Sequence, residues 1–140
     1  MAEKIFNQEF SRYYREIIKG SLPKKSGVYI VQSCTYNAAN KTVDLKKLIY
    51  IGKADDIRHR VINHEKLEKW IGKLKKGEIL CYNFTLVPKK YYERVEAALI
   101  NKNQPIVNVE YKKSFPFDTT IVNCSNNYDN LKEKIRVIRR

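Results

Sequence analysis

Hydrophobic residues along the chain form continuous runs in some stretches and recur every three or four positions in others. Runs rich in β-branched and aromatic residues predict three strands, at residues 27–33, 48–52 and 78–87. The polar stretch 36–47, with its asparagine and aspartate turn formers, predicts an extended hairpin connection. The first two strands should therefore be antiparallel neighbours. Two further extended pieces are expected at residues 105–108 and 118–124.

Apolar residues at helical spacing predict four helices, at residues 4–19, 57–74, 91–103 and 127–138. Asp55 or Asp56 can cap the second helix, and Asn127 can cap the last. Gln104-Pro105 ends the third, because the residue before a proline disfavours helical geometry. The chain has 140 residues and no internal repeats, so residues 1–140 are expected to form a single α+β domain.

The chain carries a large excess of positive charge. Lysine and arginine number 28 against 15 acidic residues, which gives a net charge of +13. Such an excess favours a polyanionic partner, and nucleic acid is the first candidate. The alternative is that the protein is simply basic, as some proteins are without binding any polyanion.

Several other classes of protein fit the sequence poorly. No apolar run approaches the roughly 18 residues of a membrane span, and the N-terminus lacks the apolar segment of a secretion signal. The three cysteines are far apart and form no CxxC pair, which argues against a disulfide framework or a zinc cluster. We therefore expect a cytoplasmic protein with no membrane partner.

Polar side chains gather around the predicted start of the second helix. Tyr50 and Lys53 close the strand before it, and Arg60 and His64 lie four positions apart on one helix face. A tyrosine, a lysine, an arginine and a histidine at one helix start make a poor core and a good site for an anion.

Two short motifs and a set of later residues resemble the signature of the GIY-YIG nuclease superfamily. The motifs are Gly27-Val28-Tyr29 and Tyr50-Ile51-Gly52, and the later matches are Arg60, His64, Glu96, Pro105 and Asn108. The resemblance implies a small central antiparallel three-stranded sheet flanked by helices. It places a catalytic module at about residues 24–110, with added helices at 4–19 and 127–138.

The resemblance also implies a role for each matching residue. Glu96 would be the single protein ligand of one divalent cation, Mg²⁺ or Mn²⁺. Tyr29 would act as general base, with Tyr50 as its positioning partner and His64 as a proton relay. Arg60 would clamp the scissile phosphate with its planar guanidinium.

Simpler interpretations of these residues stay open. Glu96 could balance Lys102 or Arg94 on a helix surface, and both tyrosines could belong to the core. A phenol with a pKa of about 10 also needs roughly 3.4 kcal/mol of stabilisation to be half ionised at pH 7.5. The general base could therefore be Tyr29, Tyr50 or His64.

Additional residues are expected to support substrate binding. Asn108 would brace the backbone or Glu96. Nucleic acid would contact Lys53, Arg58, Arg60, Lys73, Lys75 and Lys76, although Arg58 could instead be a solvated or backbone-contacting charge. Tyr29 and Tyr50 are separated by twenty residues, which is longer than the usual hairpin of the family. The role of residues 30–49 is left open.

These residues together predict a divalent-metal-dependent DNA endonuclease that hydrolyses one strand per active site. Cutting both strands would then take a homodimer or a partner subunit. One alternative is a nucleic-acid-binding module of the same fold with little or no cleavage activity. Another is a nuclease that acts on RNA or on branched DNA.

Overall fold

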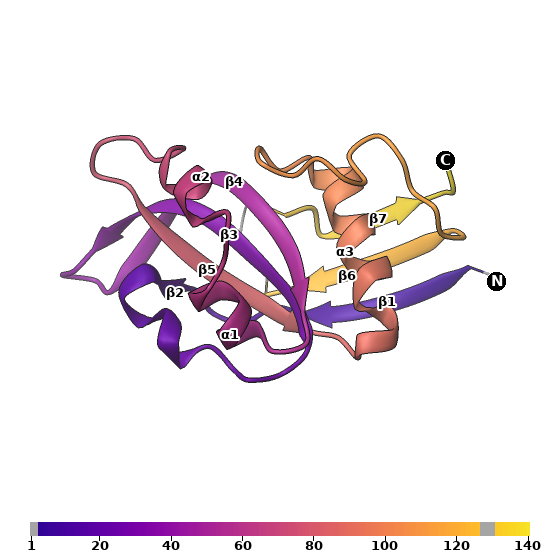
Figure 1. Cartoon of the computed structure of the whole chain (residues 1–140), viewed down its shortest axis with the longest axis horizontal. Helices are drawn as coiled ribbons and strands as arrows, with labels where there is room; N and C mark the ends of the chain where they lie inside the picture. The colour runs from indigo at the N-terminus through magenta and orange to yellow at the C-terminus, as the bar shows by residue number, and fades with distance from the viewer. Residues whose placement is uncertain (1–2, 127–130) are drawn as a thin grey trace.

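A computed structural model describes residues 3–126 and 131–140, which form two β-sheets with helices packed on them (Figure 1). The first sheet has the strand order β2-β5-β3-β4, and the second has the order β1-β6-β7. The first comprises β2 Tyr14–Arg15, β3 Gly27–Asn37, β4 Thr42–Ala54 and β5 Ile79–Leu86. The second comprises β1 Lys4–Glu9, β6 Thr120–Ser125 and β7 Lys134–Val137. The fold is α+β, as predicted, but the first sheet has four described strands instead of three, and the second sheet was not foreseen.

β3 is the central strand of the first sheet and pairs antiparallel with both β4 and β5. Its first eight residues are all buried, because both faces of the sheet are covered at that point. Val28 and Ile30 pack into a core shared with α3 (Lys89–Asn103). Tyr29 and Val31 point to the opposite face and join a second hydrophobic cluster. The antiparallel pairing of the first two predicted strands is confirmed.

The predicted polar connection at residues 36–47 is wrong in its extent, because both strands of this hairpin continue into it. β3 runs to Asn37 and β4 begins at Thr42, so only residues 38–41 join them. The first half of β4 alternates between exposed and half-buried residues, which explains its polar composition. The separation between Tyr29 and Tyr50 is therefore a longer hairpin, whose pairing shifts register between Val31 and Gln32 and between Ser33 and Cys34.

The predicted helix 57–74 is wrong as a single element, because it divides into α1 Ile57–Ile62 and α2 Leu67–Ile71. Asp56 caps α1, and its carboxylate accepts a hydrogen bond of 3.0 Å from the His59 N–H. The bend between the helices lets Trp70 become fully buried, whereas Ile71 remains 45% exposed. Burial of the large indole thus takes precedence over a continuous helix.

Both predicted terminal helices are wrong. Residues 4–19 form β1, β2 and part of a 3-10 helix, Glu16–Ser21. Phe6 and Gln8 alternate with exposed neighbours in β1, which pairs in parallel with β6. Within the predicted helix 127–138, Lys134–Val137 forms β7, and Asn127 lies outside the described residues. Pairing with β6 from both sides overrides the helical spacing of these segments.

α3 connects the two sheets. It contacts β4 of the first sheet and β6 and β7 of the second, and Figure 1 shows it lying across the second sheet. Val95, Ala98 and Leu99 are fully buried, as the sequence predicted for this helix. In the part of the chain that the structure describes, no helix is both long enough and apolar enough to cross a membrane.

Candidate active site

Tyr29 and Tyr50 lie on adjacent strands and face the same side of the first sheet. Tyr29 pairs with Gly52 across the β3–β4 ladder, and Val31 pairs with Tyr50, so the two tyrosines are diagonal neighbours. Their ring centroids are 6.3 Å apart. The hairpin register therefore brings together the two tyrosines that the sequence separates by twenty residues.

Gly52 makes room for the ring of Tyr29. A Cβ atom at position 52 would lie 2.3 Å from both Cζ and Oη of Tyr29, which is far inside van der Waals contact. Gly27 is equally restricted, since a Cβ there would lie 2.3 Å from the Thr85 carbonyl oxygen of β5. Glycine is thus required at both positions: at Gly52 because the Tyr29 ring packs against its backbone, and at Gly27 because the β5 backbone does.

His64 lies behind Tyr29, in the bend between α1 and α2. Its Nε2 is 2.8 Å from the Tyr29 hydroxyl oxygen, and its Nδ1 accepts a hydrogen bond of 3.0 Å from the Lys66 N–H. An Nδ1 that accepts a hydrogen bond carries no proton, so the neutral ring carries its proton on Nε2 and donates to Tyr29. Burial, and next the charge of Arg60, lower the His64 pKa to about 4.

Arg60 projects from α1 and has two partners. One is the Tyr29 hydroxyl, which lies close enough that the charge of Arg60 opposes the rise in the Tyr29 pKa. The other is the carboxylate of Glu65, with Nη1–Oε2 and Nη2–Oε1 distances of 3.1 and 3.3 Å. The Glu65 hydrogen bonds are the main reason that the Arg60 pKa is raised. The Tyr29 oxygen therefore accepts from His64 and lies near the positive charge of Arg60.

Both tyrosines are neutral phenols at neutral pH in the free protein. Burial is the main cause that raises the Tyr29 pKa far above its ordinary value, with a further contribution from Tyr50. Burial, and next the charge of Glu96, raise the Tyr50 pKa to about 12. Positive charge entering the site would oppose both shifts.

Glu96 projects from α3 and is only 8% exposed. Burial is the main cause that raises its pKa to about 7; Lys53 opposes this shift, and Glu93 and Glu110 add to it. The Lys53 backbone also lowers the Glu96 pKa. Arg94 donates instead to Thr120 Oγ1 at 2.7 Å. A surface role for Glu96 beside Arg94 therefore does not agree with the structure.

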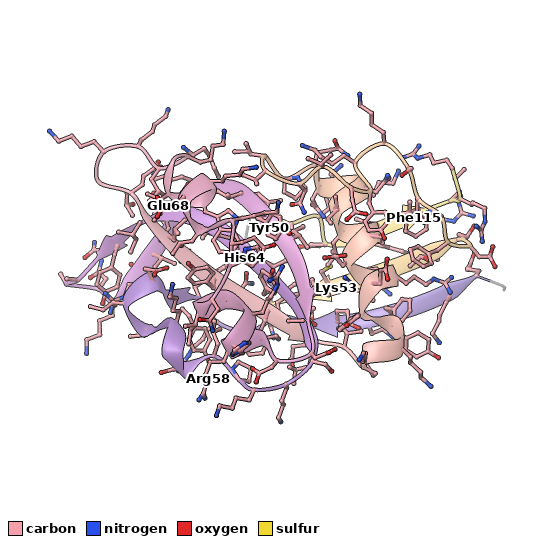
Figure 2. The ribbon with its side chains drawn as sticks, viewed as in Figure 1. Tyr50, Lys53, Arg58, His64, Glu68 and Phe115 are labelled. Carbon is pink, nitrogen blue, oxygen red and sulfur yellow. The ribbon has the colours of Figure 1, made fainter. Side chains whose placement is uncertain are left out.

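These side chains line one cleft of about 460 Å³ between α1, α3 and the edge of β4. The structure thus brings together five of the residues singled out from the sequence, namely Tyr29, Tyr50, Lys53, Arg60 and Glu96. Figure 2 shows Tyr50, His64 and Lys53 near one another in the middle of the molecule, with Arg58 and Glu68 farther out. Two strands and two helices, namely β3, β4, α1 and α3, therefore supply the residues of a single site.

Asn108 braces the strand on which Tyr50 lies. Its Oδ1 accepts from the Ile51 N–H at 2.9 Å, and its Nδ2 donates to the Ile51 carbonyl at 2.8 Å. The Val107 N–H donates to the Ile49 carbonyl at 2.9 Å, so residues 106–108 follow the edge of β4. Asn108 also lines a smaller cavity of about 150 Å³, which shares Tyr50 and Glu96 with the cleft.

Five cleft residues were missed by the sequence analysis, namely Glu65, Lys66, Glu93, Glu110 and Tyr111. Tyr111 has a left-handed backbone with φ of +66°, and its hydroxyl donates to the Glu93 carboxylate. Its place shortly after Asn108 is the only sequence signal that could have drawn attention to it. Among the described cleft residues, four carboxylates face three cationic groups, so the site is not simply a basic pocket for anions.

The predicted nucleic-acid contacts lie in four different places. Lys53 and Arg60 line the cleft, whereas Arg58 uses its Nε to donate to the Leu22 carbonyl at 2.6 Å. Lys73 lines a groove of about 470 Å³ with Lys69, Gly72, Ile106 and Val107. Val107 also lines the smaller cavity beside the cleft, so this groove adjoins the site. Lys75 and Lys76 are exposed in the turn before β5.

The donor atoms of the cleft fit a hard divalent cation held largely by water and substrate. In the part of the chain that the structure describes, no three His, Cys, Asp or Glu side chains are grouped so that they could hold a metal ion. Glu96 offers one buried carboxylate whose pKa is raised beside Glu93 and Glu110, and a cation would relieve this repulsion. Mg²⁺ commonly binds through one or two carboxylates together with waters and phosphate oxygens.

Comparisons of this chain with models of protein families, with curated proteins and with solved structures find no match. The chemistry of the site therefore has to be argued from its own geometry.

Proposed function

We propose that the protein is a divalent-metal-dependent DNA endonuclease with a GIY-YIG-like active site, which hydrolyses one strand per site. The observation that carries this proposal is the meeting of Tyr29, Tyr50, Lys53, Arg60 and Glu96 in one cleft. These residues come from β3, β4, α1 and α3. On this proposal, β5, β3 and β4 are the three strands of the GIY-YIG-like sheet, and β2 and the second sheet are additions.

Arg60 is the phosphate-binding residue of the proposed reaction. Its guanidinium presents two parallel N–H groups, which match two non-bridging oxygens of a phosphodiester. Lys53 lines the same cleft and adds a second positive charge near the phosphate. Both residues would neutralise charge that accumulates on the phosphate in the transition state.

Tyr29 orients the attacking water and then takes its proton. Its oxygen lies 2.8 Å from His64 Nε2, and the nearby charge of Arg60 opposes the rise in its pKa. In the substrate complex, Tyr29 first releases its own proton to solvent; His64 donates to the resulting phenolate and Arg60 stabilises its charge. The phenolate then accepts the proton of the attacking water. His64 is thus a positioning residue for Tyr29, while Tyr50 packs against both rings.

Glu96 would hold Mg²⁺ or Mn²⁺, which would supply charge neutralisation at the scissile phosphate and the leaving oxygen. Because the Glu96 pKa is raised to about 7, the carboxylate is half protonated at neutral pH and has to ionise before it can bind a cation. Asn108 keeps the backbone of β4 in place beside this position.

DNA is the polyanion that best accounts for the net charge of +13 together with the groove beside the cleft. Lys69 and Lys73 line that groove over a floor of Ile106 and Val107. We assign this groove to the phosphate backbone that continues from the scissile bond. A homodimer or a partner subunit would supply the second cut of a duplex.

The direct test of this proposal is nicking of supercoiled plasmid with Mg²⁺ or Mn²⁺. Wild-type protein should convert supercoiled to open-circular DNA. Glu96→Gln and Arg60→Gln should each lower the rate by about 10²-fold or more, by analogy with the loss of one group that stabilises transition-state charge. Glu68→Gln is the matched control, since Glu68 is exposed on α2 and does not line the cleft. No nicking by wild type, or nicking by the Glu96 variant at the wild-type rate, would overturn the proposal.

A second candidate is a nucleic-acid-binding module of the same fold without efficient cleavage. The observation that favours it is the raised pKa of both tyrosines, which leaves no ready base in the free protein. This candidate predicts binding of DNA or RNA that is independent of metal and falls steeply with salt, without nicking. A panel of duplex, branched and RNA substrates separates it from a nuclease that acts on RNA or branched DNA.

A further inference from the structure

The phosphate-binding fork of Arg60 is occupied by a carboxylate of the same chain. Glu65 accepts from Nη1 and Nη2 of Arg60 through its two separate oxygens, at 3.1 and 3.3 Å. This is the bidentate geometry in which a guanidinium binds two oxygens of a phosphate. Both side chains line the cleft that also contains Tyr29 and Glu96. The Glu65 carboxylate therefore stands where two phosphate oxygens would bind.

We propose that Glu65 is an internal competitor for Arg60, which a phosphodiester has to displace, and that it thereby sets the affinity of the site for DNA. This inference rests on the proposed function, since it takes the Arg60 fork as the phosphate-binding group. It goes beyond that function by assigning a role to Glu65, which is not one of the residues expected to act on the substrate.

The location of Glu65 allows this displacement. It lies between α1 and α2, outside both helices, and its side chain is 66% exposed while that of Arg60 is 39% exposed. Ion pairs this accessible to water contribute at most about 1 kcal/mol, so the competitor is weak. Arg60 and Tyr29 line the same cleft, and the charge of Arg60 acts on the Tyr29 hydroxyl, so the guanidinium can remain in the cleft when Glu65 leaves.

Glu65 acts on an incoming phosphate in two ways. It occupies the two N–H groups that the phosphate needs, and it adds a negative charge at the same position. Removing the charge while keeping the shape, as in Glu65→Gln, relieves both effects. The expected result is DNA binding that is about 3- to 10-fold tighter, within the range of an exposed ion pair plus the relieved repulsion.

The experiment measures the affinity of wild type and variants for a fluorescein-labelled 20-base-pair duplex by fluorescence anisotropy, with Ca²⁺ in place of Mg²⁺. Glu68→Gln removes the same charge one turn farther along, from an exposed position outside the cleft. It should change the affinity by less than about 2-fold. In an Arg60→Gln background, Glu65→Gln should give a clearly smaller gain than in the wild-type background, because the fork for which Glu65 competes is gone and only the relieved repulsion remains.

Unchanged or weaker binding by Glu65→Gln would overturn the inference, and so would a gain of the same size in the Arg60→Gln background. Weaker binding would show that Glu65 positions Arg60 for the substrate and does not compete with it. Plasmid nicking by wild type is assayed in parallel. Nicking by wild type together with a null result for Glu65→Gln rejects only this inference, whereas wild type that neither binds nor nicks DNA rejects the proposed function as well.

Discussion

The hydrogen bonds of His64 determine which proton transfers are open to Tyr29. The Lys66 N–H fixes the His64 proton on Nε2, and that proton is donated to the Tyr29 oxygen. His64 therefore cannot remove a proton from Tyr29 in the free protein. The proposed reaction therefore assigns the role of general base to Tyr29 and that of a positioning residue to His64.

Glu96 gives the site a pH dependence that can be measured without turnover. Its pKa is raised to about 7, so the carboxylate is mostly protonated at pH 6 and mostly ionised at pH 8. A cation binds only the ionised form, so Mn²⁺ affinity should rise by up to about tenfold from pH 6 to pH 8. Isothermal titration with Mn²⁺ checks this, and Glu96→Gln should lose the pH dependence. Equal affinity at both pH values in wild type would contradict the assignment of Glu96.

Gly52 should be among the least replaceable small residues of the chain. Gly52→Ala would place a Cβ at 2.3 Å from the Tyr29 ring, so the ring has to move away from His64 and Arg60. We expect a loss of about 1–3 kcal/mol in unfolding free energy, as for other overpacked positions. Equilibrium unfolding in denaturant measures this loss in unfolding free energy. Gly72→Ala is the control, because its helical backbone and its nearest contacts at 3.5 Å accept a methyl group. An equal effect of both variants would show that Gly52 is not constrained by Tyr29.

At the level of elements, the hairpin and α3 could be predicted from the sequence, and the terminal segments could not. β3 and α3 are buried enough that local composition agrees with their environment. β1 and β7 depend on pairing with β6, which is 116 residues from β1 and 14 from β7 when counted from their first residues. The residues of β1 and β7 do not themselves indicate that β6 will pair with them, so the helical spacing of Phe6 and Phe10 was misleading.

In the site too, the sequence identified the residues that belong to motifs and missed those that distant parts of the chain bring into the cleft. Motif spacing brought out Tyr29, Tyr50, Arg60 and Glu96, whose side chains line one cleft. Glu65, Glu110 and Tyr111 were missed because they lie in bends and loops whose course is set by packing elsewhere. Their contribution is electrostatic, and only the assembled cleft reveals it.

The groove beside α2 is expected to contribute to the salt dependence of DNA binding. Lys69→Gln with Lys73→Gln should weaken duplex binding and lower the slope of log affinity against log salt by about 1.8, if each lysine contacts one phosphate. Anisotropy titrations between about 50 and 200 mM salt give the slope. Lys113→Gln with Lys134→Gln removes the same charge from exposed positions outside the groove and should change the slope little. The same loss of slope in both pairs would show that the groove has no special role.

For the whole molecule, the net charge of +13 and the acidic cleft act on different steps. The surplus of lysine and arginine attracts a polyanion over long range, and this attraction weakens with salt. Inside the cleft, four carboxylates would repel the phosphate unless a cation accompanies it. DNA binding by lysine and arginine residues outside the cleft should therefore persist when the metal is removed. Binding of the scissile phosphate inside the cleft should not.

The separate roles of the surface and the cleft can be tested by measuring DNA affinity and plasmid nicking with and without metal. EDTA should abolish nicking entirely while lowering the affinity for a long duplex by less than about tenfold, because lysines outside the cleft still hold the backbone. Electrophoretic mobility shifts and plasmid nicking, run on the same samples, give both values. Complete loss of DNA binding on metal removal would contradict the separate roles of surface and cleft.

The central claim is that one cleft assembles a phosphodiester-cleaving site, and single-turnover cleavage of end-labelled DNA tests it most directly. With excess enzyme and Mg²⁺ or Mn²⁺, wild type should cut one strand and leave a 5′-phosphate. Tyr29→Phe should be slower by about 10²- to 10⁴-fold, and Glu96→Gln and Arg60→Gln by about 10²-fold or more, while Glu68→Gln cuts at the wild-type rate. Cleavage by Tyr29→Phe, Glu96→Gln and Arg60→Gln at the wild-type rate, or no cleavage by wild type, would contradict the account.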